Sequence, residues 1–194
     1  SNTVDDHASY GVYLTDSKRL RINHNEIKNS LGDAVYLSSN CDSAFVDNNT
    51  IKSNGDSDSG RSLRMFEVED TVLYNNTIDS NDYSGIVITE SSNNKIIQNI
   101  VKGNGKYGIQ ILNDATKSAN NTIKDNTVND NSDIAIFNHG IFTKIINNTV
   151  KYNELDGIKV ASDGARSSIS SNNLVDNEGK SIIILAKNIA IESN

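Results

Sequence analysis

The sequence is poor in several residues that often decide how a protein is stabilised or anchored. It has no proline and no tryptophan, and its only cysteine, Cys41, excludes an intramolecular disulfide. No apolar run approaches the roughly 18 residues that a membrane-spanning helix needs, so we expect no membrane insertion. The formal net charge of −7 argues against a nucleic-acid partner, which would favour clustered basic residues. The segment shows no signal peptide.

What the sequence does contain is one asparagine that recurs every 22 to 27 residues. A fixed period of roughly 20–50 residues is the signature of a solenoid. The repeat runs from end to end without a linker, so we interpret residues 1–194 as a single domain and a segment of a longer chain. The recurrent positions are Asn2, Asn25, Asn49, Asn76, Asn99, Asn126, Asn148, Asn172 and Asn194.

Each repeat contains two apolar blocks. The first alternates after a small residue, as in residues 85–88 (Gly-Ile-Val-Ile), and strict alternation is typical of a strand with one buried face. The second block brackets the asparagine, as Leu73 and Ile78 do around Asn76, so the asparagine marks a bend between two more short strands. No segment has helical periodicity, and repeats that all run the same way must pair in parallel. The sequence therefore predicts an all-β parallel β-helix with about eight coils and three strands per coil.

The recurrent asparagine suits the bend for two reasons. Asparagine tolerates the left-handed backbone region, which we expect this turn to require. Its amide group can also stack on the copies above and below as a hydrogen-bonded ladder that points inward. A second polar column precedes each first strand and is expected to line another turn. Its members are Ser30, Asn54, Asn81, Asn104, Asn131, Asn153 and Asn177.

These repeats, of the form G-I-x-I … N-x-I-x-x-N, resemble the right-handed parallel β-helix repeats of the pectate-lyase superfamily. That group includes polysaccharide lyases, alginate C5-epimerase modules, NosD-like carbohydrate-binding and sugar-hydrolase domains, and phage tailspike shafts. The resemblance covers essentially the whole chain and implies a long groove on the first-strand face, where many relatives bind sugar chains. The Asp-Pro-His motif of the alginate epimerases is absent, because the chain has no proline.

The register of the first strands predicts which side chains face outward. In the sixth repeat we take residues 133–136 as that strand, with Ile134 and Ile136 inward and Ala135 outward. Tyrosine rings can stack on sugars, and arginine can clamp a carboxylate through two hydrogen bonds. The expected outward column is Tyr13, Tyr36, Arg64, Val87, Gln110, Ala135, Lys159 and Ile183.

We predict a catalytic set of Arg64, Tyr36 and Glu67. In a lyase or C5-epimerase acting on a uronate-containing glycan, Arg or Tyr would move the sugar C5 proton, and a cation would neutralise the carboxylate. Arg64 and Glu67 lie in the irregular repeat with a 27-residue spacing, and Tyr36 lies in the repeat before it. Insertions in solenoids collect on functional faces. The predicted substrate-binding residues are Tyr13, Arg61, Glu69 and Lys159.

Residues 56–60 (Asp-Ser-Asp-Ser-Gly) have the spacing of a calcium loop but lack its later glutamate. Asp56 and Asp58 are therefore the candidate ligands for calcium, and no other cofactor is implied. We interpret His139 as a turn residue and His24 as an outward-facing one. Asp163 and Arg166 are placed to pair with each other in the seventh repeat.

Two functions from different classes remain open. In the first, the chain is an extracellular or surface β-helix that recognises, and in one version processes, an acidic polysaccharide. In the second, it is a non-catalytic shaft of an adhesin or tailspike. Both ends fall within a repeat, so we expect either a longer chain or end-to-end stacking of copies. Self-association as a trimer is a further open alternative.

Overall fold

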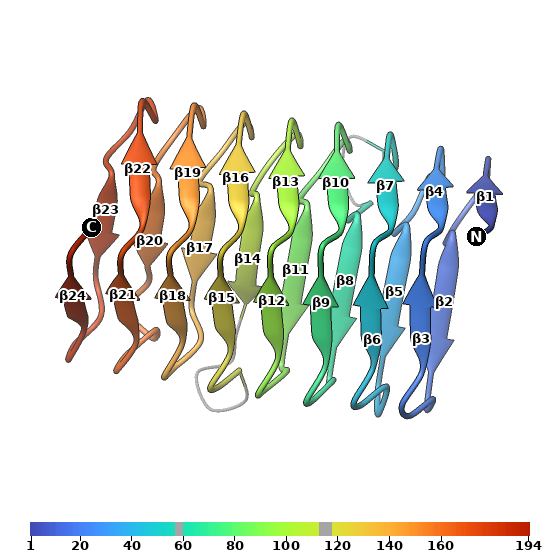
Figure 1. Ribbon diagram of the computed structural model, residues 1–194, viewed down its shortest axis with the longest axis horizontal. Coiled ribbons are helices and arrows are strands. Elements are labelled where there is room, and N and C mark those ends of the chain that lie inside the picture. The colour runs from blue at the N-terminus through green and yellow to red at the C-terminus, as the bar shows by residue number, and fades with distance from the viewer. Residues whose placement is uncertain (57–59, 113–117) are drawn as a thin grey trace.

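The computed structural model describes residues 1–56, 60–112 and 118–194. Within these ranges all regular elements are short strands, and none of the described segments forms a helix that could cross a membrane. The strands stack along one axis, with the two termini at opposite ends of the stack (Figure 1). They form three parallel sheets of eight strands, which confirms the predicted β-helix with eight coils and three strands per coil.

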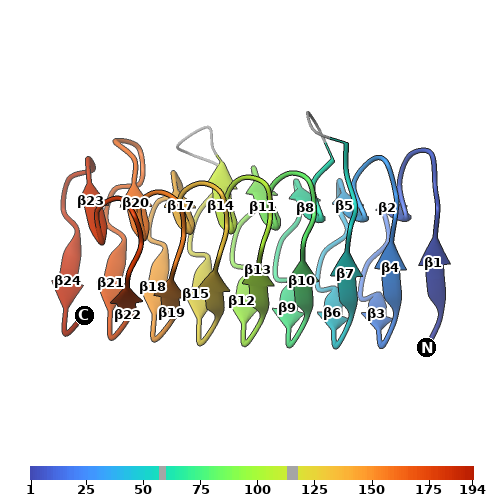
Figure 2. The ribbon, with the colours of Figure 1, turned by 90° about the horizontal axis from the view of Figure 1, so that it is seen from above.

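The first strand of each coil belongs to what we call the β2–β23 sheet, one of three rows of strands seen in Figure 2. Its register pairs Tyr13 with Tyr36 and Tyr36 with Arg64, so these outward side chains are direct neighbours. The members of the sheet are β2 (Val12–Thr15), β5 (Val35–Ser38), β8 (Leu63–Phe66), β11 (Ile86–Thr89), β14 (Ile109–Leu112), β17 (Ile136–Asn138), β20 (Ile158–Val160) and β23 (Ile182–Ile184).

The second strands form the β3–β24 sheet, and the third strands form the β1–β22 sheet. The β3–β24 sheet contains β3 (Arg21–Asn23), β6 (Phe45–Asp47), β9 (Val72–Tyr74), β12 (Lys95–Ile97), β15 (Thr122–Lys124), β18 (Lys144–Ile146), β21 (Ser168–Ser170) and β24 (Ala190–Glu192). The β1–β22 sheet contains β1 (Thr3–Asp5), β4 (Glu26–Lys28), β7 (Thr50–Lys52), β10 (Thr77–Asp79), β13 (Ile100–Lys102), β16 (Thr127–Asn129), β19 (Thr149–Lys151) and β22 (Asn173–Val175).

The core is a set of aliphatic columns that run along the stack. Leu73 and Ile78, which bracket one recurrent asparagine, are fully buried, as the alternating pattern predicts. Their counterparts in neighbouring coils lie directly above and below them through the parallel register. Each coil therefore buries its apolar face only against its neighbours, which is why a chain of modest apolar content can form this core.

The recurrent asparagines form the predicted ladder inside the stack. At Asn76, the side-chain Nδ2 donates to Asn99 Oδ1 at 3.0 Å and to the carbonyl of Val46 at 2.8 Å. Asn76 Oδ1 in turn accepts hydrogen bonds from the backbone and side-chain nitrogens of Asn49, both at 3.0 Å. The same exchange links all nine positions from Asn2 to Asn194. The ladder satisfies buried backbone amides that the bend would otherwise leave without partners.

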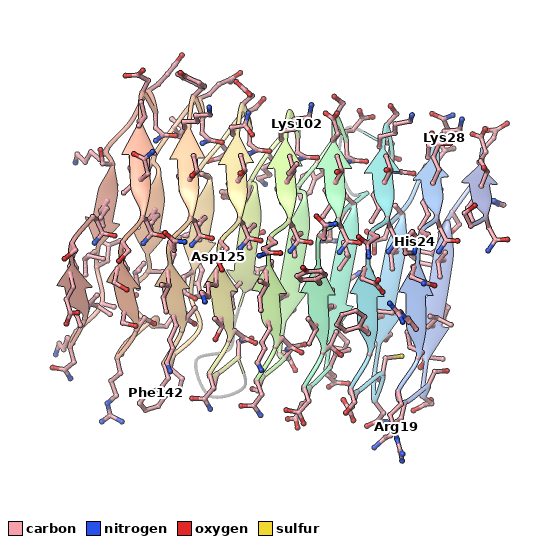
Figure 3. All side chains as sticks on the ribbon, viewed as in Figure 1. Arg19, His24, Lys28, Lys102, Asp125 and Phe142 are labelled. Carbon is pink, nitrogen blue, oxygen red and sulfur yellow. The ribbon has the colours of Figure 1, made fainter. Side chains whose placement is uncertain are left out.

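The left-handed residue at this bend is not the ladder asparagine, which corrects one prediction. The residue before it has positive φ, including His24 at 54° and Asp125 at 57°, and both lie along the bend in Figure 3. Their side chains point outward, as predicted for His24. The ladder asparagine is selected for its inward amide group instead. The second polar column is likewise preceded by residues with positive φ, such as Asn29 and Ser53.

A third polar column, which the sequence reasoning missed, lies at the corner before the β3–β24 sheet. Thr71 N donates to Asn94 Oδ1 at 2.9 Å, and Asn94 N donates to Asn121 Oδ1 at 3.0 Å. These three side chains are fully buried. All three corners of the coil therefore use inward polar side chains to satisfy turn amides.

The sixth coil departs from the predicted register by two residues. Ile136 and Asn138 of β17 face inward, and Phe137 faces outward between Gln110 and Lys159. Ala135, predicted to lie outward on the strand, instead occupies the small-residue position before it. Space explains that requirement, because a Cβ added at the equivalent Gly108 would lie 2.4 Å from Val128 Cγ1.

Candidate functional site

The N-terminal part of the β2–β23 sheet carries a stack of tyrosine rings. The ring of Tyr13 lies 5.2 Å from that of Tyr10 and 5.3 Å from that of Tyr36, measured between centroids. Arg64 continues the column, with its guanidinium carbon 4.5 Å from the centre of the Tyr36 ring. Tyr10 and Tyr13 are 42% and 49% exposed, so both residues are accessible to a ligand. The sequence reasoning named three of these residues and missed Tyr10, which precedes its strand.

A pocket of about 440 Å³ opens beside this stack. Arg64 Nη1 lies 3.5 Å from the carboxylate of Asp33, and the backbone nitrogen of Arg61 donates to the same carboxylate at 2.8 Å. Arg64 Nε is buried and has no hydrogen-bond partner among the residues that the structure describes. Residues lining the pocket include Ser9, Tyr10, Gly32, Asp33, Asp56, Arg61 and Arg64.

Burial controls the ionisation of Asp33. The residue is 3% exposed, and this burial raises the pKa of the carboxyl above its ordinary value of 3.8, although Arg61 and Arg64 lower it in part. An acid whose pKa is raised by folding stabilises the fold fully below its unfolded-state pKa. That contribution is lost as the pH rises through the folded-state pKa.

Asp33→Asn is therefore expected to be more stable than the wild type at neutral pH, because asparagine cannot ionise. The asparagine Oδ1 can still accept the hydrogen bond from Arg61 N. The difference in free energy of unfolding should vanish below about pH 3.8, the ordinary pKa of the group. Urea denaturation at both pH values measures it. A variant that is less stable than the wild type at neutral pH would mean that the arginines outweigh burial.

The remaining predicted residues are only partly brought together. Glu67 lies at the corner after β8, exposed, and its Oε2 accepts a hydrogen bond from Ser39 Oγ at 3.0 Å. Glu69 is exposed at the next turn, where its backbone nitrogen donates to Asp42 at 2.9 Å. Both follow β8, whereas Arg61 precedes it. Lys159 lies four coils from Arg64, roughly 19 Å at the spacing of adjacent strands.

The predicted calcium ligands are only partly described. Asp56 lines the pocket beside Arg61. Asp58 falls in residues 57–59, outside the described ranges. Within those ranges, no group of three or more His, Cys, Asp or Glu side chains is arranged to hold a metal ion.

A second cluster of rings and cations lies on the same sheet, three coils further on. The ring of Phe137 is 5.4 Å from that of Tyr107 and 4.4 Å from the imidazole of His139. Lys159 Nζ lies 5.4 Å from the centre of the Phe137 ring. The sequence reasoning missed Phe137, because the register error had placed Ala135 in the outward column. It also missed Tyr107, which precedes its strand as Tyr10 does.

His139 lies in the loop after β17, as predicted, and Asp163 holds it there, which corrects the prediction that Asp163 pairs with Arg166. His139 Nδ1 lies 2.9 Å from one carboxylate oxygen of Asp163 and 3.1 Å from the other. Asp163 does not pair with Arg166, whose guanidinium carbon lies 5.4 Å from the centre of the Phe142 ring instead. A carboxylate only accepts hydrogen bonds, so it places the imidazole hydrogen on Nδ1. The opposite nitrogen, Nε2, then carries a lone pair, as a general base requires.

Two side chains beside this cluster, Tyr107 and Lys106, have raised pKa values. Burial raises the pKa of Tyr107, with a smaller contribution from Asp133. Lys106 Nζ donates to Tyr83 Oη at 2.7 Å, and this hydrogen bond raises the pKa of the lysine. At neutral pH the site therefore presents a neutral phenol beside a charged ammonium group.

Residues 1–143 match the family model described as a right-handed beta-helix region. The chain belongs to the right-handed beta-helix family. A search of the curated proteins found no match.

Several solved structures share the fold at low sequence identity. The periplasmic alginate epimerase AlgG superposes with a TM-score of 0.73 at 16% identity, covering 94% of this chain and 47% of that chain. The AlgE6 A-module, a mannuronan C-5 epimerase of Azotobacter vinelandii, gives 0.75 at 12% identity, covering 91% of this chain and 58% of that chain. DFA-IIIase of Arthrobacter chlorophenolicus A6, in complex with GF2, gives 0.75 at 12% identity, with coverages of 98% and 53%. The chain thus spans about half the length of these proteins, and the likeness establishes the fold.

Proposed function

We propose that the outer face of the β2–β23 sheet binds an extended acidic polysaccharide. The observation that carries this proposal is the repeated combination of aromatic rings and cations along one sheet. Tyr13, Tyr36 and Arg64 form one cluster, and Phe137 and Lys159 contribute to the other. Rings can stack on the apolar faces of sugars, and cations can pair with carboxylates. The polysaccharide-modifying relatives of the same fold support this substrate class.

The spacing of the two clusters suits a linear polymer. Tyr36 and Phe137 occupy the same outward column, four coils apart, which is roughly 19 Å at the strand spacing. A sugar chain lying along the stack would meet one outward side chain per coil. The whole chain carries a net charge of −7, so local cations such as Arg64 and Lys159 must provide the attraction for an acidic polymer.

The same face offers groups for proton transfer beside a uronate carboxylate, as a lyase or C5-epimerase requires. His139, oriented by Asp163, presents Nε2 as a base, and Lys159 offers a positive charge from the adjacent coil. Of the catalytic set predicted from the sequence, Arg64 and Tyr36 lie at the other cluster and Glu67 lies at the corner after β8. That set stays a prediction. AlgG is periplasmic, which supports a location outside the cytoplasm for this chain, and within that class we favour an extracellular or surface location.

Arg64→Ala is expected to weaken binding of a polyuronate about 10- to 100-fold. The lost interaction is a charge-assisted hydrogen bond, and each factor of ten corresponds to about 1.4 kcal/mol. Arg64→Lys should recover only part of the affinity, because lysine cannot form the bidentate pair. Lys144→Ala makes the same change of charge on the β3–β24 sheet and is the matched control. Isothermal titration calorimetry with polyuronates and with a neutral glucan measures each affinity.

The outcomes separate the two function classes. A polyuronate that binds the wild type and Lys144→Ala equally, and Arg64→Ala weakly, supports the proposal. If a glycan array shows no acidic polymer bound, the proposal fails and the chain acts as a structural shaft. A lyase assay that follows the absorbance of the unsaturated product, run on the same samples, tests for processing.

A further inference from the structure

One inward position of the sixth coil breaks the pattern of the core. Asn138 is fully buried and is the inward residue at the end of β17. In the other coils this column is apolar without exception. Its members are Leu14, Leu37, Met65, Ile88, Ile111, Val160 and Ile184. A buried amide in a column that accepts aliphatic side chains costs desolvation and forgoes apolar burial, so this asparagine requires an explanation.

The side-chain hydrogen bonds of Asn138 go to two loops. Its Nδ2 donates to the carbonyl of Gly140 at 3.0 Å and to Ser167 Oγ at 3.2 Å. Its Oδ1 accepts a hydrogen bond from Gly140 N at 3.1 Å. Its backbone carbonyl accepts one from Ala161 N at 2.9 Å. The side chain therefore bridges the loop after β17 and the loop after β20.

Ser167 extends this bridge. Its hydroxyl lies 2.9 Å from the carbonyl of Gly164 and 3.2 Å from that of Gly140, and Thr143 N donates to it at 3.1 Å. Gly164 lies in this network with no space for a side chain, because an added Cβ would lie 2.6 Å from Val160 Cγ1. His139 lies beside Gly140 in the first loop, and Asp163 lies beside Gly164 in the second. The buried network thus holds both members of the His139–Asp163 pair.

We propose that Asn138 is a positioning residue that holds His139 and Asp163 in their paired geometry. This inference rests on the proposed function, in which the His139 imidazole is the base. Asn138 touches no ligand-facing surface, because it lies beneath the sheet. It acts through the two loops, and it fixes which imidazole nitrogen is left free to take a proton.

The test uses the unliganded protein and the variant Asn138→Leu. Leucine occupies the same inward position in two other coils, as Leu14 and Leu37. The readout is the ¹⁵N NMR spectrum of the imidazoles at a pH where they are neutral. In the wild type, His139 should be the Nδ1–H tautomer. The exposed His7 and His24 provide reference signals in the same spectrum. In Asn138→Leu, His139 should become a mixture of tautomers, as in Asp163→Asn, while cooperative unfolding is retained.

The outcomes are decisive in either direction. If Asn138→Leu keeps the Nδ1–H tautomer of His139, Asn138 serves the loops alone and the proposal is overturned. If that variant does not fold, Ser167→Ala removes one partner of the network and should shift His139 part of the way toward a mixture; no shift would again overturn the proposal. Ile111→Val is the control for a core change in the same column. Failure of polysaccharide binding by the wild type would defeat the proposed function without altering this tautomer measurement.

Discussion

Replacing Asn76 with leucine is expected to lower the free energy of unfolding by about 3–6 kcal/mol. The substitution removes four hydrogen bonds of the buried amide group. It leaves the backbone nitrogen of Asn49 and the carbonyl of Val46 without these partners in a dry interior. Each orphaned buried group costs roughly 1–3 kcal/mol, so the loss is comparable to the whole stability of a typical domain.

Asn75→Gly is the matched control for this measurement. Asn75 is the adjacent asparagine, but it is exposed and has a φ of 50°, which glycine adopts without strain. Urea denaturation followed by circular dichroism should show a large change for Asn76→Leu and a small one for Asn75→Gly. Equal effects of the two substitutions would contradict the account of the ladder, because they would assign the role of asparagine to turn conformation.

Substituting His139 with glutamine is expected to lower the turnover of an acidic polysaccharide by about 10²- to 10⁴-fold, the usual contribution of a general base. Glutamine retains hydrogen-bonding capacity but cannot accept a proton at neutral pH. Binding of the polymer should change little, since the aromatic rings and cations of the face remain. The effect should therefore appear in kcat, whereas Arg64→Ala should raise KM.

His24→Gln provides the control, because His24 is exposed at the bend between the other two sheets (Figure 3). It should leave turnover unchanged. Turnover that survives in His139→Gln but is lost in Tyr36→Phe or Glu67→Gln would move the catalytic role to the first cluster. That result would support the set predicted from the sequence.

The fold could be predicted because every coil must bury the same apolar positions and satisfy the same turn amides. The period, the alternating first strand and the bracketed asparagine each specify one part of the coil, and they agree with one another. The reason for the asparagine was less visible. Sequence cannot show whether an asparagine turns the chain or points inward beside a residue that does, because both positions favour polar residues. His24, before Asn25, shows the difference, since it carries the positive φ.

The candidate site was predicted only in part, and the main error is the register of the sixth coil around Asn138. The polar Asn138 occupies an inward position, so an apolar pattern favours Ile134 and Ile136 as the inward pair. That choice moved Phe137 off the outward column and hid its contact with His139. The requirement for a small residue before each first strand would have selected Ala135 and the correct register. Contacts between separate loops, such as His139 with Asp163, have no signal in a single sequence.

The most direct test of the central claim maps a bound oligouronate on the ¹⁵N-labelled protein by NMR. The account predicts chemical-shift changes along the outer face of the β2–β23 sheet, beginning near Tyr13 and Tyr36 and extending to Phe137 and Lys159. The amides of the β1–β22 sheet should change little. Changes confined to the β1–β22 or β3–β24 sheet, or no change at saturating ligand, would contradict the assignment of this face to an acidic polysaccharide.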